Sequence, residues 1–291
     1  MTMHIPDQTG RTAIITGGSS GIGKAAADAL AARGARVIIA VRDQTRGRAA
    51  AADIGARAES RPLDLSSLAS VREFADTIDG PIDYLINNAG FMTATRGVTT
   101  DGFEGQFGVN HLGHFALTNL LVGRITARVV TVTSRNYRKA HIDFDDLHWE
   151  RRPYRPFGAY GQTKLANMLF TRELQRRLTR AGSPVLATAA EPGWAATGFT
   201  MTTGRRILDR TLGLGTRLLA QNAEGGARPT LLATVGEVPA ASLSGPGLFG
   251  VRGPAVLEKV TGEALDDDIA RRLWDVSERL TGTGFPLPAA R

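Results

Sequence analysis

The chain of 291 residues contains no cysteine. Disulfide bonds, thiol catalysis and cysteine-ligated zinc are therefore excluded. No apolar run approaches the ~18 residues that a membrane-spanning helix requires, and residues 1–10 lack the apolar stretch and cleavage site of a signal peptide. We therefore expect a cytoplasmic protein.

Metal-binding patterns are also missing. The five histidines include no His-x-x-x-His pair with an accompanying acid. Asp143, Asp145 and Asp146 lack the spacing of an EF-hand, so a solvated loop is the favoured interpretation. His111 and His114 are expected to serve helix packing and capping, and no bound metal is predicted.

The chain is basic, with a net charge of +7 and a pI of about 10.3. Its arginines are spread over the sequence and form no long basic block. This distribution favours a solvated basic surface around an anionic ligand over a nucleic-acid interface, whose signature would be salt-dependent retention on DNA. The hydrophobic share of 42% is enough to fill a sizeable core.

Strand-like and helix-like patterns alternate from Arg11 to about Val251. Apolar and β-branched runs predict strands at 12–16, 36–41, 58–63, 84–87, 129–133 and 185–190. Helices are predicted at 21–33, from Ser66 or Ser67 to 78, at 103–122, 159–180 and 266–280. This alternation predicts an α/β fold: a doubly wound parallel sheet of about seven strands, flanked by helices.

One domain over residues 1–291 is the economical interpretation, because no internal repeat or low-complexity linker is present. Residues 197–223 look like an inserted segment in which apolar residues alternate with arginines. Two interpretations of this segment stay open. It is either a flap that covers the substrate or a basic amphipathic helix at a membrane surface.

A glycine-rich turn joins the first predicted strand to its helix, with the sequence Thr16-Gly17-Gly18-Ser19-Ser20-Gly21-Ile22-Gly23. Gly17, Gly21 and Gly23 let the backbone turn tightly and approach a phosphate without Cβ atoms in the way. The helix N-terminus then offers free N–H groups to the anion. The turn predicts a seat for a dinucleotide's pyrophosphate, but it does not choose among nicotinamide, flavin and other nucleotide ligands.

Arg42 and Asp43 directly follow the second predicted strand, where dinucleotide-binding folds face the adenosine ribose. A carboxylate at this point hydrogen-bonds a 2′-hydroxyl, whereas an arginine pairs with a 2′-phosphate. Arg42 therefore favours NADP(H) over NAD(H), and the neighbouring Asp43 is the feature that argues the other way.

Tyr160 and Lys164 have the i,i+4 spacing that places two side chains on one helix face. A phenol titrates near ~10, and a nearby ammonium and an oxidised nicotinamide both favour its ionised form. Ser134 ends a predicted strand, where open α/β sheets place their ligands. Asn110 is an unusual mid-helix residue and is expected to hold water near Lys164. The four residues predict proton transfer coupled to hydride transfer.

These motifs, with Asn87-Asn88-Ala89-Gly90 and Pro192-Gly193, stand in the order found in the short-chain dehydrogenase/reductase family, which the chain resembles over nearly its whole length. The resemblance implies a Rossmann fold and a catalytic tetrad of Asn110, Ser134, Tyr160 and Lys164. It also implies that Asp64 contacts adenine and that Asn87 and Ala89 line the adenosine side of the site. Other residues would contact the ribose, nicotinamide and pyrophosphate. The implied cofactor residues are Gly17, Ser19, Ser20, Gly21, Ile22, Gly23, Arg42, Asp64, Leu65, Asn87, Ala89, Gly90, Tyr160, Lys164, Pro192, Gly193 and Thr197.

Finer features are similar to the branch of retinol dehydrogenases and WW-domain-containing oxidoreductases. They include Ala40-Val41-Arg42-Asp43, Val109-Asn110-His111-Leu112-Gly113-His114-Phe115 and the late Leu273-Trp274 helix. This branch implies an apolar substrate of retinoid, steroid or other lipophilic type. It also suggests a dimer or tetramer through helices 103–122 and 159–180, although monomers occur. The sequence shows no WW domain, and Trp194 stands where a smaller residue is expected.

The sequence thus predicts an NADP(H)-dependent oxidoreductase that acts on a carbonyl or alcohol. Two other classes share parts of the pattern. A non-catalytic NADP-binding regulatory protein would need the fold and the glycine turn, but not a labile phenol. A methyltransferase has a glycine-rich first turn, but it does not account for Arg42 or for the Tyr160/Lys164 pair.

Overall fold

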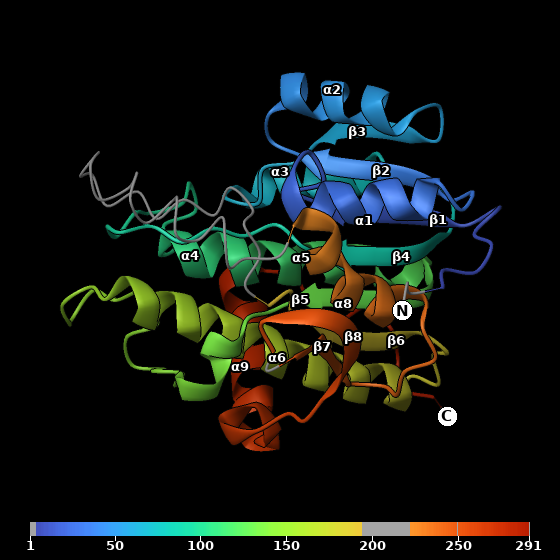
Figure 1. Cartoon of the computed structure of the whole chain (residues 1–291). Coiled ribbons are helices and arrows are strands. Elements are labelled where there is room, and N and C mark those ends of the chain that lie inside the picture. The colour runs from blue at the N-terminus through green and yellow to red at the C-terminus, as the bar shows by residue number, and fades with distance from the viewer. Residues whose placement is uncertain (1–3, 194–221, 249, 291) are drawn as a thin grey trace, which may run out of the picture.

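The isoleucine- and valine-rich runs form the centre of a twisted sheet (Figure 1). The computed structural model describes residues 4–193, 222–248 and 250–290. In these residues eight strands lie in the order β3-β2-β1-β4-β5-β6-β7-β8. All neighbouring pairs are parallel except the antiparallel pair β7–β8. The strands are β1 Thr12–Thr16, β2 Arg36–Val41, β3 Ala58–Pro62, β4 Ile82–Asn87, β5 Ile125–Val132, β6 Leu186–Ala190, β7 Leu243–Leu248 and β8 Arg252–Glu258.

Successive strand residues point to opposite faces of the sheet and enter two separate cores. Ile14 and Leu85 belong to the core under α3, α5, α6 and α9. Ile15 and Ile86 belong to the core under α1, α2 and α8. The helices are α1 Gly21–Ala31, α2 Gln44–Ile54, α3 Leu68–Asp76, α5 Gly113–Leu121, α6 Pro156–Arg180, α8 Ala223–Val235 and α9 Asp267–Thr281. The predicted doubly wound α/β fold is confirmed, with one strand more than the seven expected.

The order of the strands creates the crevice in which such folds bind ligands. β1 pairs with β2 on one side and with β4 on the other. The chain therefore returns to the centre of the sheet after β3 and continues outward in the opposite direction. Ligands of open α/β sheets bind at this reversal, beyond the carboxyl ends of the strands. Thr16 ends β1 at this point, and Asn87 ends β4 beside it.

The helix predicted over 103–122 forms without a break from Gly105 to Leu121, but it contains a π-helical segment. It consists of a short turn α4 at Gly105–Phe107, a π-helical segment at Gly108–Leu112 and then α5. The buried carboxylate of Glu104 accepts hydrogen bonds from the N–H groups of Gln106 and Phe107, at 2.9 and 2.7 Å, and so starts the turn. Asn110 lies inside the π-helical segment, a conformation that frequently occurs at functional sites.

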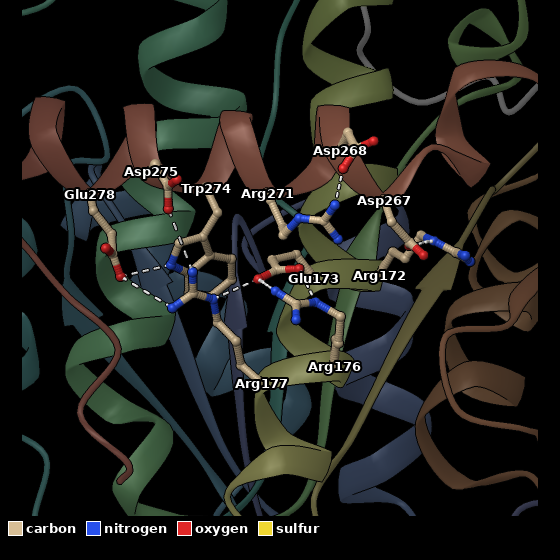
Figure 2. A network of polar contacts seen from close by, with 10 residues as sticks. All are labelled: Arg172, Glu173, Arg176, Arg177, Asp267, Asp268, Arg271, Trp274, Asp275 and Glu278. Carbon is tan, nitrogen blue, oxygen red and sulfur yellow. Dashed lines mark hydrogen bonds and ion pairs between the residues drawn. The ribbon is translucent and has the colours of Figure 1, made fainter. Parts of the chain in front are cut away.

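The last helix, α9, lies across α6 (Figure 2). Trp274 is 1% exposed, and its ring stacks on Phe170 of α6 and meets Phe115 of α5 edge-on, with centroid distances of 5.7 and 4.8 Å. The Arg177 guanidinium lies 4.4 Å from the centre of the Trp274 ring. The buried Glu173 carboxylate accepts hydrogen bonds from Arg177, at 2.8 Å, and from Arg176. Helix α9 therefore covers the two helices through which self-association was predicted.

Candidate active site

The glycine turn has the shape that a phosphate cradle needs. Gly17 and Gly21 adopt positive φ angles of 69° and 54°, which residues with a side chain rarely adopt. A Cβ on Gly23 would lie 2.5 Å from the Asn88 side-chain nitrogen and 2.7 Å from the Gly17 carbonyl oxygen. Ser20 is the N-cap of α1, and its side chain makes no capping hydrogen bond. The first-turn N–H groups of α1 thus fit an anionic ligand, with Ser19 and Ile22 half-buried beside them.

Arg42 and Asp43, the two charged residues that follow β2, have different roles. Asp43 is the N-cap of α2, and its carboxylate accepts a hydrogen bond of 3.0 Å from the Arg46 N–H. Arg42 is exposed, and it forms no ion pair with the described residues. The carboxylate that argued for NAD(H) therefore has a structural role, and the guanidinium beside it can meet an anion.

Two of the residues predicted to lie near adenosine, Asp64 and Asn87, are held by hydrogen bonds within the protein. Asp64 accepts hydrogen bonds from the Ser66 N–H and hydroxyl, at 2.9 and 2.6 Å, and so shapes the loop that also contains the buried Leu65. The Asn87 side chain turns inward and donates to the Thr118 hydroxyl at 2.9 Å. This orientation leaves the Asn87 backbone, and not its amide, as the part that can face a ligand.

Thr16 connects the glycine turn to the loop after β4. Its hydroxyl oxygen accepts hydrogen bonds from the N–H groups of Asn88 and Ala89, both at 2.9 Å. The same oxygen lies 2.8 Å from His114 Nε2. His114 Nδ1 lies 3.2 Å from the Asn110 carbonyl oxygen, so one buried imidazole joins the cofactor side of the site to Asn110.

Tyr160 and Ser134 meet at the carboxyl edge of the sheet. Ser134 follows β5 and forms a hydrogen bond with the Tyr160 hydroxyl. Lys164 Nζ lies 5.3 Å from the centre of the Tyr160 ring and donates a hydrogen bond of 3.2 Å to the Val132 carbonyl. The structure thus brings these three predicted catalytic residues together.

Asn110 is fully buried beside them. Its side chain accepts from the Phe91 N–H at 3.0 Å and donates to the Phe91 carbonyl at 2.9 Å. A Cβ on Gly90 would lie 3.2 Å from Asn110 Oδ1 and 3.6 Å from Lys164 Nζ, so Gly90 keeps this corner open. Asn110 therefore fixes the loop after β4 against α6, and its expected role in holding water stays a prediction.

Burial dominates the ionisation of the two titratable groups. It lowers the pKa of the Lys164 ammonium to about 8. It raises the pKa of the Tyr160 phenol, while the hydrogen bond from Ser134 lowers this pKa and the charge of Glu191 raises it. The sequence predicted that Lys164 and an oxidised nicotinamide together make this phenol acidic. Burial acts in the opposite direction in the protein alone, and the combined effect of Lys164 and the nicotinamide stays a prediction.

Other predicted residues lie at the rim of the site or elsewhere. Pro192 and Gly193 follow β6, and Gly193 has a φ of 69°. Thr197 and most of the 197–223 segment fall outside the described residues. His111 Nε2 lies 3.0 Å from the Ser277 hydroxyl of α9, in the expected packing role. Sequence reasoning missed Glu191, a buried carboxylate whose only signal was an acidic residue before Pro192.

Comparison with known proteins adds four findings. The family model for short chain dehydrogenases matches residues 11–207. Retinol dehydrogenase 13 of Homo sapiens is 44% identical over 292 residues, which cover 95% of this chain and 86% of that protein. Polyprenol dehydrogenase of Mus musculus is 40% identical over 302 residues, which cover 96% and 86%. A crystal structure of an uncharacterized protein from Mycobacterium paratuberculosis superposes with a TM-score of 0.85 at 48% identity, covering 97% of each chain.

Proposed function

The chain belongs to the short-chain dehydrogenase family, and we propose that it is an NADP(H)-dependent oxidoreductase that interconverts an apolar alcohol and its carbonyl compound. The observation that carries the proposal is the meeting of the Ser134 and Tyr160 hydroxyls, with Lys164 one helical turn further along α6. This meeting lies at the carboxyl edge of the sheet, where the fold places its ligands.

The preference for NADP(H) rests on Arg42. Its guanidinium is exposed at the end of β2, and the carboxylate next to it is engaged in capping α2. A planar guanidinium can pair bidentately with a 2′-phosphate. The glycine turn and the N-terminus of α1 would hold the pyrophosphate, and Lys164 would hold the nicotinamide ribose.

The reaction needs two hydroxyls that hold one substrate oxygen. When bound, the nicotinamide supplies the hydride acceptor or donor. Ser134 and Tyr160 position the substrate oxygen, and Tyr160 gives its proton to a carbonyl oxygen or takes one from an alcohol. Burial favours the protonated phenol, which suits carbonyl reduction. The Lys164 ammonium stabilises the phenolate that remains after the proton has moved, and an oxidised nicotinamide adds a second positive charge nearby.

An apolar substrate is supported by two exposed phenylalanines near the predicted catalytic residues in the chain. The Phe91 N–H donates a hydrogen bond to Asn110, and Phe157 lies one turn before Tyr160 on α6. Their side chains are 38% and 57% exposed. The names of the two relatives refer to retinol and polyprenol, which are both apolar alcohols.

We also propose that this chain does not assemble through α5 and α6. Helix α9 already occupies that face, with Trp274 between Phe115 and Phe170. Among the described residues, no helix has the length and apolar character needed to cross a membrane. Sedimentation of the purified protein is expected to give the mass of a single chain at micromolar concentration, and a stable wild-type dimer whose interface lies on α5 and α6 would contradict the assignment.

The decisive variant is Tyr160→Phe. It removes the proton donor but keeps the ring, so turnover of all-trans-retinal and long-chain aldehydes with NADPH should fall by at least ~100-fold, while NADPH binding is retained. The matched control is Tyr137→Phe, because the buried Tyr137 hydroxyl has no hydrogen-bond partner among the described residues. Turnover that survives in Tyr160→Phe would refute the assigned role. A wild-type protein that binds NADPH but reduces no carbonyl would instead favour a regulatory protein.

A further inference from the structure

Glu191 is a buried acid that the proposed reaction does not use. It directly follows β6 and precedes Pro192, and it is 3% exposed. Its N–H donates a 2.8 Å hydrogen bond to the Ser244 carbonyl of β7, which fixes its backbone in the sheet. A carboxylate is expensive to bury without a partner, so the groups around it indicate why the position is occupied by an acid.

The partners of Glu191 form a chain of four alternating charges. Glu191 Oε2 accepts from Arg135 Nε at 3.1 Å. Arg135 also donates to Glu258 Oε1 at 3.0 Å, and Glu258 Oε2 accepts from Arg138 at 2.7 Å. The chain of charges thus ties the end of β6 and the turn 135–139 to β8, which is distant in the sequence.

Two glycines leave space for these charged groups. Gly250 has a φ of 63°, and a Cβ there would overlap the Arg135 guanidinium. A Cβ on Gly245 would overlap the Glu258 carboxylate. The absence of a Cβ at these two positions therefore leaves room for the Arg135–Glu258 ion pair.

The network reaches the reacting hydroxyls through two connections. Arg135 directly follows Ser134, and Ser134 is the N-cap residue of the turn that Arg135 begins. Ser134 in turn forms a hydrogen bond with the Tyr160 hydroxyl, and the charge of Glu191 raises the pKa of the Tyr160 phenol. Among the described residues, the charged groups that act on Glu191 are Glu258, Arg135 and Arg138.

We propose that Glu191 is a positioning residue of this active site, which holds the Ser134 turn through Arg135 and places one negative charge near the Tyr160 hydroxyl. This inference rests on the proposed oxidoreductase function. An ionised Glu191 favours the protonated phenol, which is the form needed to reduce a carbonyl. It disfavours the phenolate, which is the form needed to oxidise an alcohol.

The test is the pH profile of Glu191→Gln. The amide keeps the shape and can still accept from Arg135, but it removes the charge. For oxidation of all-trans-retinol with NADP+, the rising limb of the pH profile of kcat should move by about half a pH unit toward acid. At a fixed pH on that limb, the activity should be roughly threefold higher than in wild type. Reduction of all-trans-retinal should fall on its basic side by a similar factor. Glu191→Asp, which keeps the charge, should retain the wild-type profile with a lower kcat.

Glu224→Gln is the matched control, because Glu224 is exposed on α8 and takes no part in the network. Superimposable profiles of Glu191→Gln and wild type would overturn the proposal. If Glu191→Gln does not fold, Glu258→Gln is the second variant. Glu258 raises the pKa of Glu191, so Glu258→Gln should leave Glu191 more fully ionised and shift the same limb toward base, and an unchanged limb would again overturn the proposal. Failure of the oxidoreductase function itself is distinguishable, because wild type would then show no turnover.

Discussion

Replacing Trp274 with alanine would remove the side chain that joins α9 to the rest of the molecule. The indole is 1% exposed and contacts Phe115, Phe170 and the Arg177 guanidinium. Its Nε1–H donates to Glu278 Oε1 at 2.7 Å. The same carboxylate oxygen also accepts from the Phe285 N–H at 3.2 Å, so Glu278 keeps a partner in the variant.

The expected loss follows from these contacts. Truncation of a buried tryptophan to alanine costs ~3–5 kcal/mol of unfolding free energy, and loss of the cation–π contact with Arg177 adds about 1 kcal/mol. We expect a total near 4 kcal/mol, because α9 can relax in part toward the cavity. Trp274→Phe keeps an aromatic ring but loses the indole N–H and some volume, and it should cost ~1–2 kcal/mol.

Urea unfolding followed by circular dichroism measures both losses. Leu265→Ala is the control, because Leu265 precedes α9 and is 48% exposed, and its unfolding free energy should change by less than ~0.5 kcal/mol. Trp274→Ala should also associate with rising concentration, since it uncovers Phe115 and Phe170. A loss below ~1 kcal/mol for Trp274→Ala, with an unchanged sedimentation coefficient, would refute the packing role of α9.

Two further predictions concern the cofactor and pH. Arg42→Ala should weaken binding of NADPH at least tenfold and leave NADH almost unchanged, as judged by fluorescence titration; equal losses would remove Arg42 from the phosphate site. Burial lowers the pKa of His111 to about 3 and of His114 to about 4. The unfolded chain therefore binds more protons at these histidines below pH 6.5, and the free energy of unfolding decreases as the pH falls. Each contributes a loss of up to ~1.4 kcal/mol per pH unit. Burial raises the pKa of Glu191 from 4.5 to about 7. Between these pH values the folded state binds more protons at Glu191, and the resulting gain in stability offsets the loss from one of the two histidines. Urea midpoints should therefore fall from pH 6.5 to 5, and a rise would contradict the assignment.

Local patterns were sufficient for the centre of the fold and for placing Tyr160 and Lys164 on one helix face. Residues 36–41 form β2 as predicted, and Ser67 caps α3 by accepting from the Ser70 N–H. Period and capping depend on near neighbours in the chain, so they can be read without coordinates. The i,i+4 spacing of Tyr160 and Lys164 is local in the same sense, and it survives in α6.

Features that depend on distant contacts were not predictable. The π-helical segment around Asn110 has an ordinary helical sequence pattern, so the sequence alone did not predict it. β8 contains Gly253 and Pro254 and lies at the edge of the sheet, so it lacks the apolar run of a central strand. The Glu191–Arg135–Glu258 network joins residues up to 123 positions apart. No spacing rule connects residues at such a separation.

The most direct test of the proposed function follows a deuterium atom from NADPH to product. Wild-type protein is incubated with NADPH deuterated at nicotinamide C4 and with all-trans-retinal, and the products are analysed by mass spectrometry. The account predicts one deuterium on the carbinol carbon of retinol, with formation of this product reduced at least ~100-fold in Tyr160→Phe and retained in Tyr137→Phe. Tight binding of NADPH without deuterium transfer to this or any other apolar carbonyl would contradict it.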